Sequence, residues 1–440
     1  MSNLEIGIAS FPVLLLLIFL RVPIGLSMLI CGLGGLAILT GGPNVVLSKL
    51  KSETYSTFSS YSLSIIPLFL LMGQFSTLGG MSKALFKAAE TWLGHRRGGV
   101  AMAAIGACAG FGAICGSSLA TAATMSQVAL PELRRYGYSG GLATATLAAG
   151  GTLGILIPPS VILVIYAILT EQNIAKLFLA AFVPGILAAI GYLITISIYV
   201  RLNPDAAQMR ERVPYGERLQ ALVEVWPVLL VFLVVVGGIY LGWFTPTEGA
   251  AIGAAGTGII AYSNGGLSLK ALTDSILSTA NSSAMIFFIV LGAAFYNSFL
   301  ALSQVPQEVS AFVVSQGYSP WLILSIILML YLVFGCVMDS LSMILLTIPI
   351  FFPIISELDF GMTSEELAIW FGILVLIVVE VGLITPPVGM NLFVINTLDK
   401  ETPMVETYRG VMPFVLSDLI RVVILVIFPG ITLFLLRWTS

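Results

Sequence analysis

Charged residues are scarce in this 440-residue chain: Asp, Glu, Lys and Arg make up 9% of it, against 58% hydrophobic residues. A soluble domain carries roughly 25% charged residues. So little charge cannot cover a surface that faces water, which excludes a soluble globular protein. Lipid must therefore be its solvent, and the sequence predicts an all-α integral membrane protein.

Histidine and cysteine are equally rare. One histidine, His95, and four widely spaced cysteines without a CxxC pattern indicate neither a metal site nor a disulfide framework. The chain also lacks the HExxH and GxSxG motifs and a second histidine, and Asp339 and Glu380 lie about 40 residues apart. An intramembrane enzyme is therefore not expected, and no catalytic residue is predicted.

Long apolar runs are what the chain has instead. A spanning helix needs about 20 apolar residues. We predict ten spans, near 6–20, 22–40, 61–80, 140–169, 174–200, 225–243, 247–263, 282–302, 365–396 and 407–436. One long helix over 6–40 competes with the break at 21–23. The segments 44–60 and 82–97 are predicted to be amphipathic helices at the membrane interface.

Two further apolar stretches, 98–134 and 320–356, are interrupted in the middle by small or polar residues, and we predict that each forms a re-entrant hairpin. With the N-terminus outside, 14 Lys and Arg residues fall on the inner face and four on the outer face, namely Lys49, Lys51, Lys176 and Arg437. This asymmetry satisfies the positive-inside rule. It predicts that both termini are periplasmic, and it favours the break at 21–23.

A weak internal repeat divides the chain. Ser118 pairs with Ser340 at an offset of 222 positions, and the string GILIPP at 154–159 pairs with GLITPP at 382–387 at an offset of 228. With five spans and one hairpin in each half, the second copy must be inverted in the membrane. We therefore expect two inverted repeats, 1–200 and 225–440, joined by a cytoplasmic linker at 201–224. The broken helices would lie at 140–169 and 365–396.

The proline pairs Pro158-Pro159 and Pro386-Pro387 cannot continue a helix, so they leave backbone carbonyls free at membrane depth. Such backbone is tolerated only where it lines a cavity or meets other protein. Free carbonyls and hydroxyls suit a cation such as sodium, and half-helix N-termini suit a carboxylate. The hydroxyls near these breaks are those of Ser117, Ser118, Thr121, Thr152, Ser340, Ser342 and Thr385.

Three of the acidic residues within or beside spans bear on the site or on a helix start. Asp339 is either a cation ligand or the N-cap of the second hairpin helix, and the sequence favours neither. Glu380 is interpreted as a structural hydrogen-bonding group near the second break rather than a catalytic one. Glu248 follows Thr245 and Pro246, which is typical of a helix start.

These motifs resemble a known family, the large membrane subunit (M subunit, DctM-like) of tripartite ATP-independent periplasmic (TRAP) transporters. The matching strings are RVPIGL, GAICGSSLATAAT, GILIPPS, FTPTEGAA, MDSLSMILLTIPI and GLITPPVGMNLFVI. They extend from about residue 20 to 395, and together they are highly specific. The resemblance implies a sodium-driven, elevator-type importer of organic acids in a bacterial inner membrane.

The resemblance also implies two partners, a small four-helix membrane subunit and a periplasmic substrate-binding protein, with the small subunit expected as a separate chain and no nucleic acid expected. It implies sodium sites at the two hairpin tips. The first site would involve Gly116, Ser117, Ser118, Thr121, Gly150, Gly151, Thr152, Gly154 and Pro158. The second would involve Asp339, Ser340, Ser342, Gly382, Thr385, Pro386 and Asn391. A standalone sodium/carboxylate symporter without a binding protein is the alternative.

Overall fold

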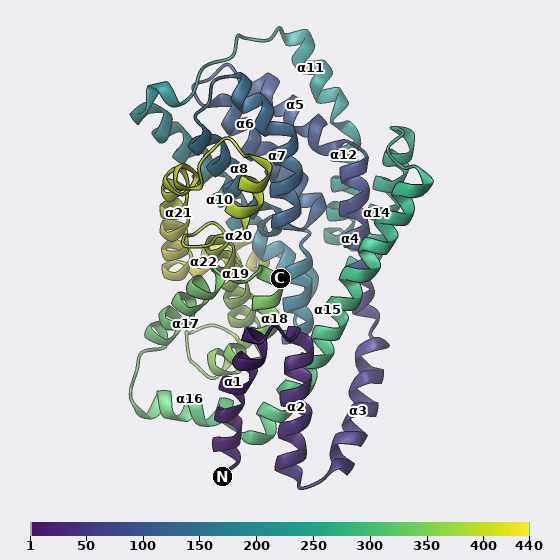
Figure 1. Cartoon of the computed structure of the whole chain (residues 1–440), viewed down its shortest axis with the longest axis vertical. Coiled ribbons are helices and arrows are strands. Elements are labelled where there is room, and N and C mark those ends of the chain that lie inside the picture. Colours follow the sequence, from purple (N-terminus) through teal and green to yellow (C-terminus); the bar gives the residue numbers. More distant parts are fainter. Residues whose placement is uncertain (1, 440) are drawn as a thin grey trace.

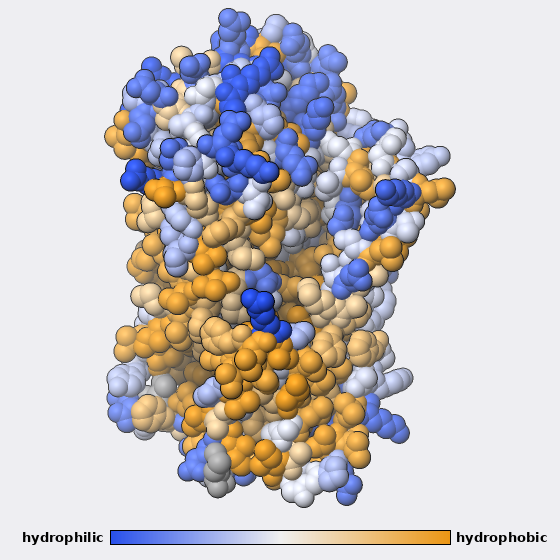
Figure 2. Space-filling model, in the orientation of Figure 1, coloured by the Kyte–Doolittle hydropathy of each residue, from blue (hydrophilic) through white to orange (hydrophobic). Residues whose placement is uncertain are grey.

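The computed structural model describes residues 2–439, and within that range every regular element is helical. The molecule is elongated, with α5 (Met81–Leu93) and α11 (Tyr215–Glu224) at one end and the N-terminus at the other (Figure 1). Hydrophilic residues gather at the α5–α11 end, and a broad apolar band lies below it (Figure 2). So large an apolar surface requires lipid around it, and the prediction of an all-α membrane protein is confirmed.

Several helices are long and apolar enough to cross a membrane. The uninterrupted ones are η1 with α4 (Tyr61–Leu78), α10 (Ile174–Leu202), α15 (Leu269–Ser303) and α21 (Met404–Ile427). Two bent pairs are further candidates, α8 (Gly140–Leu156) with α9 (Val161–Thr170), bent by 43°, and α11 with the segment Trp226–Tyr240, bent by 45°.

The first two apolar runs form separate helices, α1 (Asn3–Phe19) and α2 (Ile24–Thr40), which confirms the predicted break. Arg21 adopts a left-handed conformation with φ 65°. Pro23 precedes α2 and has no N–H with which to continue α1. The local sequence alone is therefore sufficient to end one helix and start the next.

Both segments expected at the membrane interface are helical. They form α3 (Pro43–Phe58) and α5, which lie over 44–60 and 82–97. Helix α5 is strongly amphipathic and buries Met81 and Phe86 against the core, while Lys83 and Lys87 face the cleft described below. Helix α14 (Pro246–Ser263) packs along α4.

Three expectations about individual elements were wrong. The span at 407–436 is two helices, α21 and α22 (Pro429–Thr439), because Pro429 forces Phe428 out of the helical conformation. Helix α15 begins at Leu269 rather than 282, since its polar first turns extend beyond the apolar run. An additional helix, α16 (Val305–Ser315), precedes the second hairpin.

Two other segments differ from the expectation, one by being broken up and one by being partly helical. The span at 225–243 consists of α12 (Trp226–Phe232), the π-helical turn η3 (Leu233–Gly237) and the short α13 (Gly238–Tyr240). The linker at 201–224 contains η2 (Pro204–Ala206) and α11.

The centre of the molecule is built from four helix pairs. These are α6 (Gly99–Cys115) with α7 (Ser118–Arg135), α8 with α9, α17 (Pro320–Gly335) with α18 (Ser340–Ser356), and α19 (Ser364–Gly382) with α20 (Met390–Leu398). Every residue from Gly141 to Leu156 in α8 and from Leu367 to Gly382 in α19 is buried. Helices covered on all sides form the middle of a core, so the core surrounds the two interrupted helices.

Candidate functional site

The first hairpin turns at two residues between α6 and α7. Gly116 ends α6 with φ 65°, a conformation that favours glycine. Ser117 is extended, and its Oγ accepts a hydrogen bond from the Ala120 N–H at 3.4 Å, so it is the N-cap of α7. The tip therefore places the N-terminus of α7 and the Ser118 hydroxyl next to each other inside the protein.

The first interrupted helix breaks where the proline pair predicts. Helix α8 ends at Leu156, the Pro158–Pro159 peptide bond is cis, and Ser160 caps α9. Because neither proline has an N–H, the carbonyls one turn earlier receive no helical hydrogen bond. The break thus combines free carbonyl oxygens with the N-terminus of a second helix.

The first hairpin packs directly on the first break, glycine against glycine. A Cβ added to Gly112 would lie 2.4 Å from Gly154 Cα. A Cβ added to Gly154 would lie 2.5 Å from Thr121 Oγ1 and 2.8 Å from the Ser117 carbonyl oxygen. Only glycine permits this approach, which brings the hydroxyl and carbonyl oxygens of the tip onto α8.

The second hairpin and break repeat this arrangement. Asp339 Oδ2 accepts a hydrogen bond from the Ser342 N–H at 3.0 Å, so Asp339 caps α18 as Ser117 caps α7. A Cβ added to Gly382 would lie 2.5 Å from Gly335 Cα. Beyond the cis Pro386–Pro387 bond, the Gly389 N–H donates to the Cys336 carbonyl at 3.0 Å.

Glu380 joins the two hairpin tips. It lies in α19, two residues before Gly382, and is 0% exposed. Its Oε1 accepts a hydrogen bond from the Ser340 hydroxyl at 2.6 Å and a longer one from the Ser118 hydroxyl at 3.5 Å. Glu380 therefore contacts both tips and not only the nearby second break.

Other residues of the predicted site have partners within the fold. Thr152 Oγ1 donates to the Ala149 carbonyl at 2.7 Å and lies 2.9 Å from the Tyr192 hydroxyl. Thr385 Oγ1 donates to the Val381 carbonyl at 2.6 Å. Asn391 Nδ2 donates to the Ala148 carbonyl at 3.2 Å, which links α20 to α8 across the two halves.

Three buried oxygen atoms around the tips have no hydrogen-bond partner among the described residues. They are Thr121 Oγ1 at the first site, Asn391 Oδ1 at the second and Glu380 Oε2 between them. Buried polar atoms in proteins are normally hydrogen-bonded. All three can accept a hydrogen bond or ligate a cation.

A polar network that the sequence did not reveal continues from Thr152. The Tyr192 hydroxyl in α10 donates to Asp418 Oδ2 at 2.7 Å, and Asp418 Oδ1 lies 2.9 Å from Arg421 Nη2. One available signal was the pair Asp418 and Arg421, two charged residues within the predicted span 407–436. The repeat offers a second one, because Thr152 and Glu380 stand 228 positions apart, the offset of the two breaks, and so are equivalent residues.

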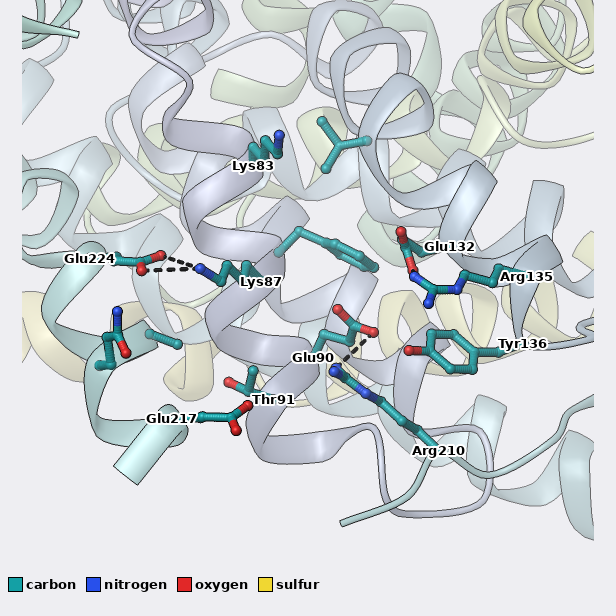
Figure 3. A pocket seen from close by; sticks show the side chains of 14 residues that line it. Lys83, Lys87, Glu90, Thr91, Glu132, Arg135, Tyr136, Arg210, Glu217 and Glu224 are labelled. Atoms are coloured by element: carbon teal, nitrogen blue, oxygen red, sulfur yellow. Dashed lines mark hydrogen bonds and ion pairs between the residues drawn. The ribbon is translucent and has the colours of Figure 1, made fainter. Parts of the chain in front are cut away.

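A polar cleft of about 530 Å³ lies elsewhere, at the hydrophilic end between α5, α7 and α11 (Figure 3). Arg210 Nη1 lies 2.9 Å from Glu90 Oε1, and Lys87 Nζ donates to Glu224 at 2.7 Å. Burial raises the pKa of the Glu90 carboxyl above its ordinary value of 4.5, and Arg210 opposes this rise. The cleft is a joint between helices rather than part of the predicted sites.

Known proteins resemble this chain over nearly its full length. The family model "Tripartite ATP-independent periplasmic transporter, DctM component" matches residues 11–431. The C4-dicarboxylate TRAP transporter large permease protein DctM of Pseudomonas aeruginosa is 36% identical over 406 residues, which are 92% of this chain and 93% of that protein. The sialic acid TRAP transporter permease protein SiaT of Haemophilus influenzae is 30% identical over 426 residues, which are 96% of this chain and 66% of SiaT.

The fold is also similar to that of solved structures. The crystal structure of the YdaH transporter of Alcanivorax borkumensis, described as having an unusual topology, matches with a TM-score of 0.64. The match covers 88% of this chain and 89% of YdaH at 14% sequence identity. At that identity the likeness concerns the fold alone.

Proposed function

The chain belongs to the DctM family of tripartite ATP-independent periplasmic transporter components, and on that premise we propose that it imports small organic acids, carboxylates or sugar acids, driven by sodium ions. Members of the family are transporters, so the prediction that the chain is not an enzyme is confirmed. C4-dicarboxylates and sialic acid, named for two relatives, are both organic acids. The substrates of these relatives support an organic acid as the substrate of this chain.

The main support for the proposal is the contact between a hairpin tip and a broken helix, which occurs in both halves. In each half, one glycine of the hairpin packs on one glycine of the interrupted helix, Gly112 on Gly154 and Gly335 on Gly382. Inverted repeats in secondary transporters bind substrate and ions where such helices are discontinuous. The unpaired oxygens of Thr121 and Asn391 lie at these places and fit a ligand that accepts electron pairs.

We assign the coupling sodium ions to the two tips. At the first tip, the ligand oxygens would come from Ser117, Ser118, Thr121 and the backbone of 150–158. At the second tip, they would come from Asp339, Ser340, Ser342, Asn391 and the backbone of 382–386. Hydroxyl, amide, carboxylate and carbonyl oxygens are the ligands that hard cations prefer. Asp339 can cap α18 with one oxygen and offer the other to the ion.

A carboxylate substrate needs attraction that sodium and helix dipoles can supply. Helices α7, α9 and α18 all begin at the tips or breaks, and a helix N-terminus favours negative charge. The bound cations would add to this attraction. The substrate therefore does not require an Arg or Lys at the breaks.

Transport would proceed by an elevator movement of the hairpins and broken helices as one body. The moving body comprises α6 to α9 and α17 to α20, and α1, α2, α4, α14 and α15 would form the scaffold. The close packing of α2 with α15 and of α4 with α14 supports such a scaffold. The halves 1–200 and 225–440, with the linker 201–224, would be the two inverted repeats.

The protein would function with a small membrane subunit and a periplasmic substrate-binding protein, because these complete the tripartite system that gives the family its name. SiaT is longer than this chain, which covers 66% of it. We place the chain in the bacterial inner membrane with its N-terminus and C-terminus in the periplasm. The hydrophilic α5–α11 end, which carries Lys83, Lys87 and Arg210, would then face the cytoplasm.

Uptake into proteoliposomes tests the proposal. The chain is reconstituted with its small subunit and binding protein, and radiolabelled dicarboxylates and sugar acids are supplied outside. We expect accumulation that requires an inward sodium gradient and stops when choline replaces sodium. Uptake that is unaffected by removing the gradient would refute sodium coupling.

The alternative is a standalone sodium/carboxylate symporter. It predicts uptake of free substrate by the chain without a binding protein. The same proteoliposomes, with the binding protein omitted, distinguish the two. We expect no uptake above empty liposomes in that arm.

A further inference from the structure

The two hairpin tips converge on a single carboxylate oxygen. Ser118 and Ser340 occupy equivalent positions of the two repeats, 222 residues apart, and each begins the second helix of its hairpin. Both hydroxyls donate to Glu380 Oε1, Ser340 at 2.6 Å and Ser118 at 3.5 Å. Glu380 itself has no equivalent carboxylate, because Thr152 stands at its position in the first half.

The hydrogen bonds to Glu380 affect how the two serine hydroxyls can ligate a cation. When a serine oxygen ligates a cation, its lone pairs point to the ion and its proton points away. That proton needs an acceptor, and a buried hydroxyl without one turns to a carbonyl of its own helix instead. Glu380 Oε1 supplies the acceptor for both serines.

We propose that Glu380 is a positioning residue shared by both sodium sites: its one oxygen orients the Ser118 and Ser340 hydroxyls so that their lone pairs face the ions at the two tips. The inference rests on the proposed assignment of sodium to those tips. It adds that the two sites are energetically coupled through a residue that ligates neither ion. The unequal distances imply that the second tip is held more firmly than the first.

Burial supports a specific role over simple packing. Glu380 is 0% exposed, and Ser118 and Ser340 are 2% and 4% exposed, so all three groups lie away from water. Removing one partner in such a site leaves buried polar atoms unsatisfied. Among residues 2–439, no side chain other than those of Ser118 and Ser340 donates a hydrogen bond to Glu380.

The test compares Glu380→Leu, which removes the acceptor, with Glu380→Gln, which keeps an acceptor oxygen. Glu365→Gln is the matched control, since Glu365 is exposed at the start of the same helix and pairs with Lys176. Sodium binding is measured as the rise in unfolding temperature of the detergent-purified protein with NaCl over choline chloride. Sodium-dependent uptake by the reconstituted complex is measured in parallel.

Glu380→Leu should raise the sodium concentration for half-maximal stabilisation by up to about tenfold, the size expected for one lost hydrogen bond. Glu380→Gln should restore most of the affinity, and Glu365→Gln should match the wild type. A Glu380→Gln variant as defective as Glu380→Leu would overturn the proposal.

Double-mutant cycles examine the shared acceptor directly. In the Glu380→Leu background, Ser118→Ala and Ser340→Ala should each weaken sodium binding less than they do in the wild type. The Ser118→Ala/Ser340→Ala pair should also be non-additive, which can be measured even if Glu380→Leu does not fold. Additive effects in these cycles would show that the sites are independent.

The outcomes separate this inference from the proposed function. If NaCl and choline chloride affect the wild type equally and uptake ignores sodium, the sodium assignment itself is wrong. If the wild type responds specifically to sodium but Glu380→Leu responds identically, only the role of Glu380 is refuted.

Discussion

The Tyr192 hydroxyl donates to Asp418 Oδ2 at 2.7 Å, and this bond ties the first broken helix to the last long helix of the second half. Tyr192 lies in α10 and also contacts Thr152 in α8, while Asp418 in α21 pairs with Arg421. A buried charge is tolerated only when it is paired and hydrogen-bonded. The first interrupted helix is thus linked, through Tyr192, to a charged pair of the second half.

Tyr192→Phe should therefore destabilise the protein by about 1.5–3 kcal/mol, because it removes a buried hydrogen bond to a charged group. The change keeps the ring that packs edge-on against Phe414. The unfolding temperature in detergent is the measurement. Tyr199→Phe, on the same helix, is the control and should have no effect.

Ser118→Ala and Ser340→Ala should each weaken the sodium dependence of uptake, by about tenfold in half-maximal concentration if one ligand or orienting bond is lost. Cys336→Ala should not, because its side chain only donates to the Leu332 carbonyl of its own helix. Sodium titrations of initial uptake rates provide the comparison. Equal sodium affinity in all three variants would reject the site assignment.

Gly154→Ala and Gly382→Ala should each cost about 1–3 kcal/mol of stability, the usual penalty for overpacking a core. The added Cβ would meet the Ser117 carbonyl at 2.8 Å in the first case and Gly335 Cα at 2.5 Å in the second. Thermal unfolding in detergent measures the cost.

Gly106→Ala is the control for these glycine variants. Gly106 lies on the exposed face of α6 with nothing within 4 Å of an added Cβ. It should be neutral or slightly stabilising, since alanine favours helix over glycine by about 1 kcal/mol. A Gly154→Ala protein as stable as Gly106→Ala would contradict the close packing of tip on break.

The stability of the α5–α7–α11 joint should depend on pH through Glu90. Its pKa is raised in the folded protein, so the unfolded chain releases the proton first as pH rises, and stability falls above about pH 4.5. Unfolding temperatures over about pH 4 to 8 should show a decline in the wild type that is smaller in Glu90→Gln. Glu217→Gln, exposed at the rim of the same cleft, should keep the wild-type slope.

Local signals in the sequence predicted much of the architecture. The break at Arg21 and the interruptions at Pro158-Pro159 and Pro386-Pro387 depend on proline and glycine, whose backbone preferences act within a few residues. The same kind of signal stands at Pro429, although hydropathy alone predicts one continuous span there. The start of α15 was missed because polar residues can extend a helix out of the membrane.

By itself, then, the sequence determined that lipid surrounds this protein, where its helices break, and which family it belongs to, because hydropathy and backbone restriction are properties of neighbouring residues. Only the tertiary structure decided that Ser118 and Ser340 meet at Glu380 and that Thr152 reaches Asp418 through Tyr192. These partners are between 40 and 262 residues apart in the chain. Which buried hydroxyl finds which acceptor depends on how the two halves pack, and no local pattern encodes that.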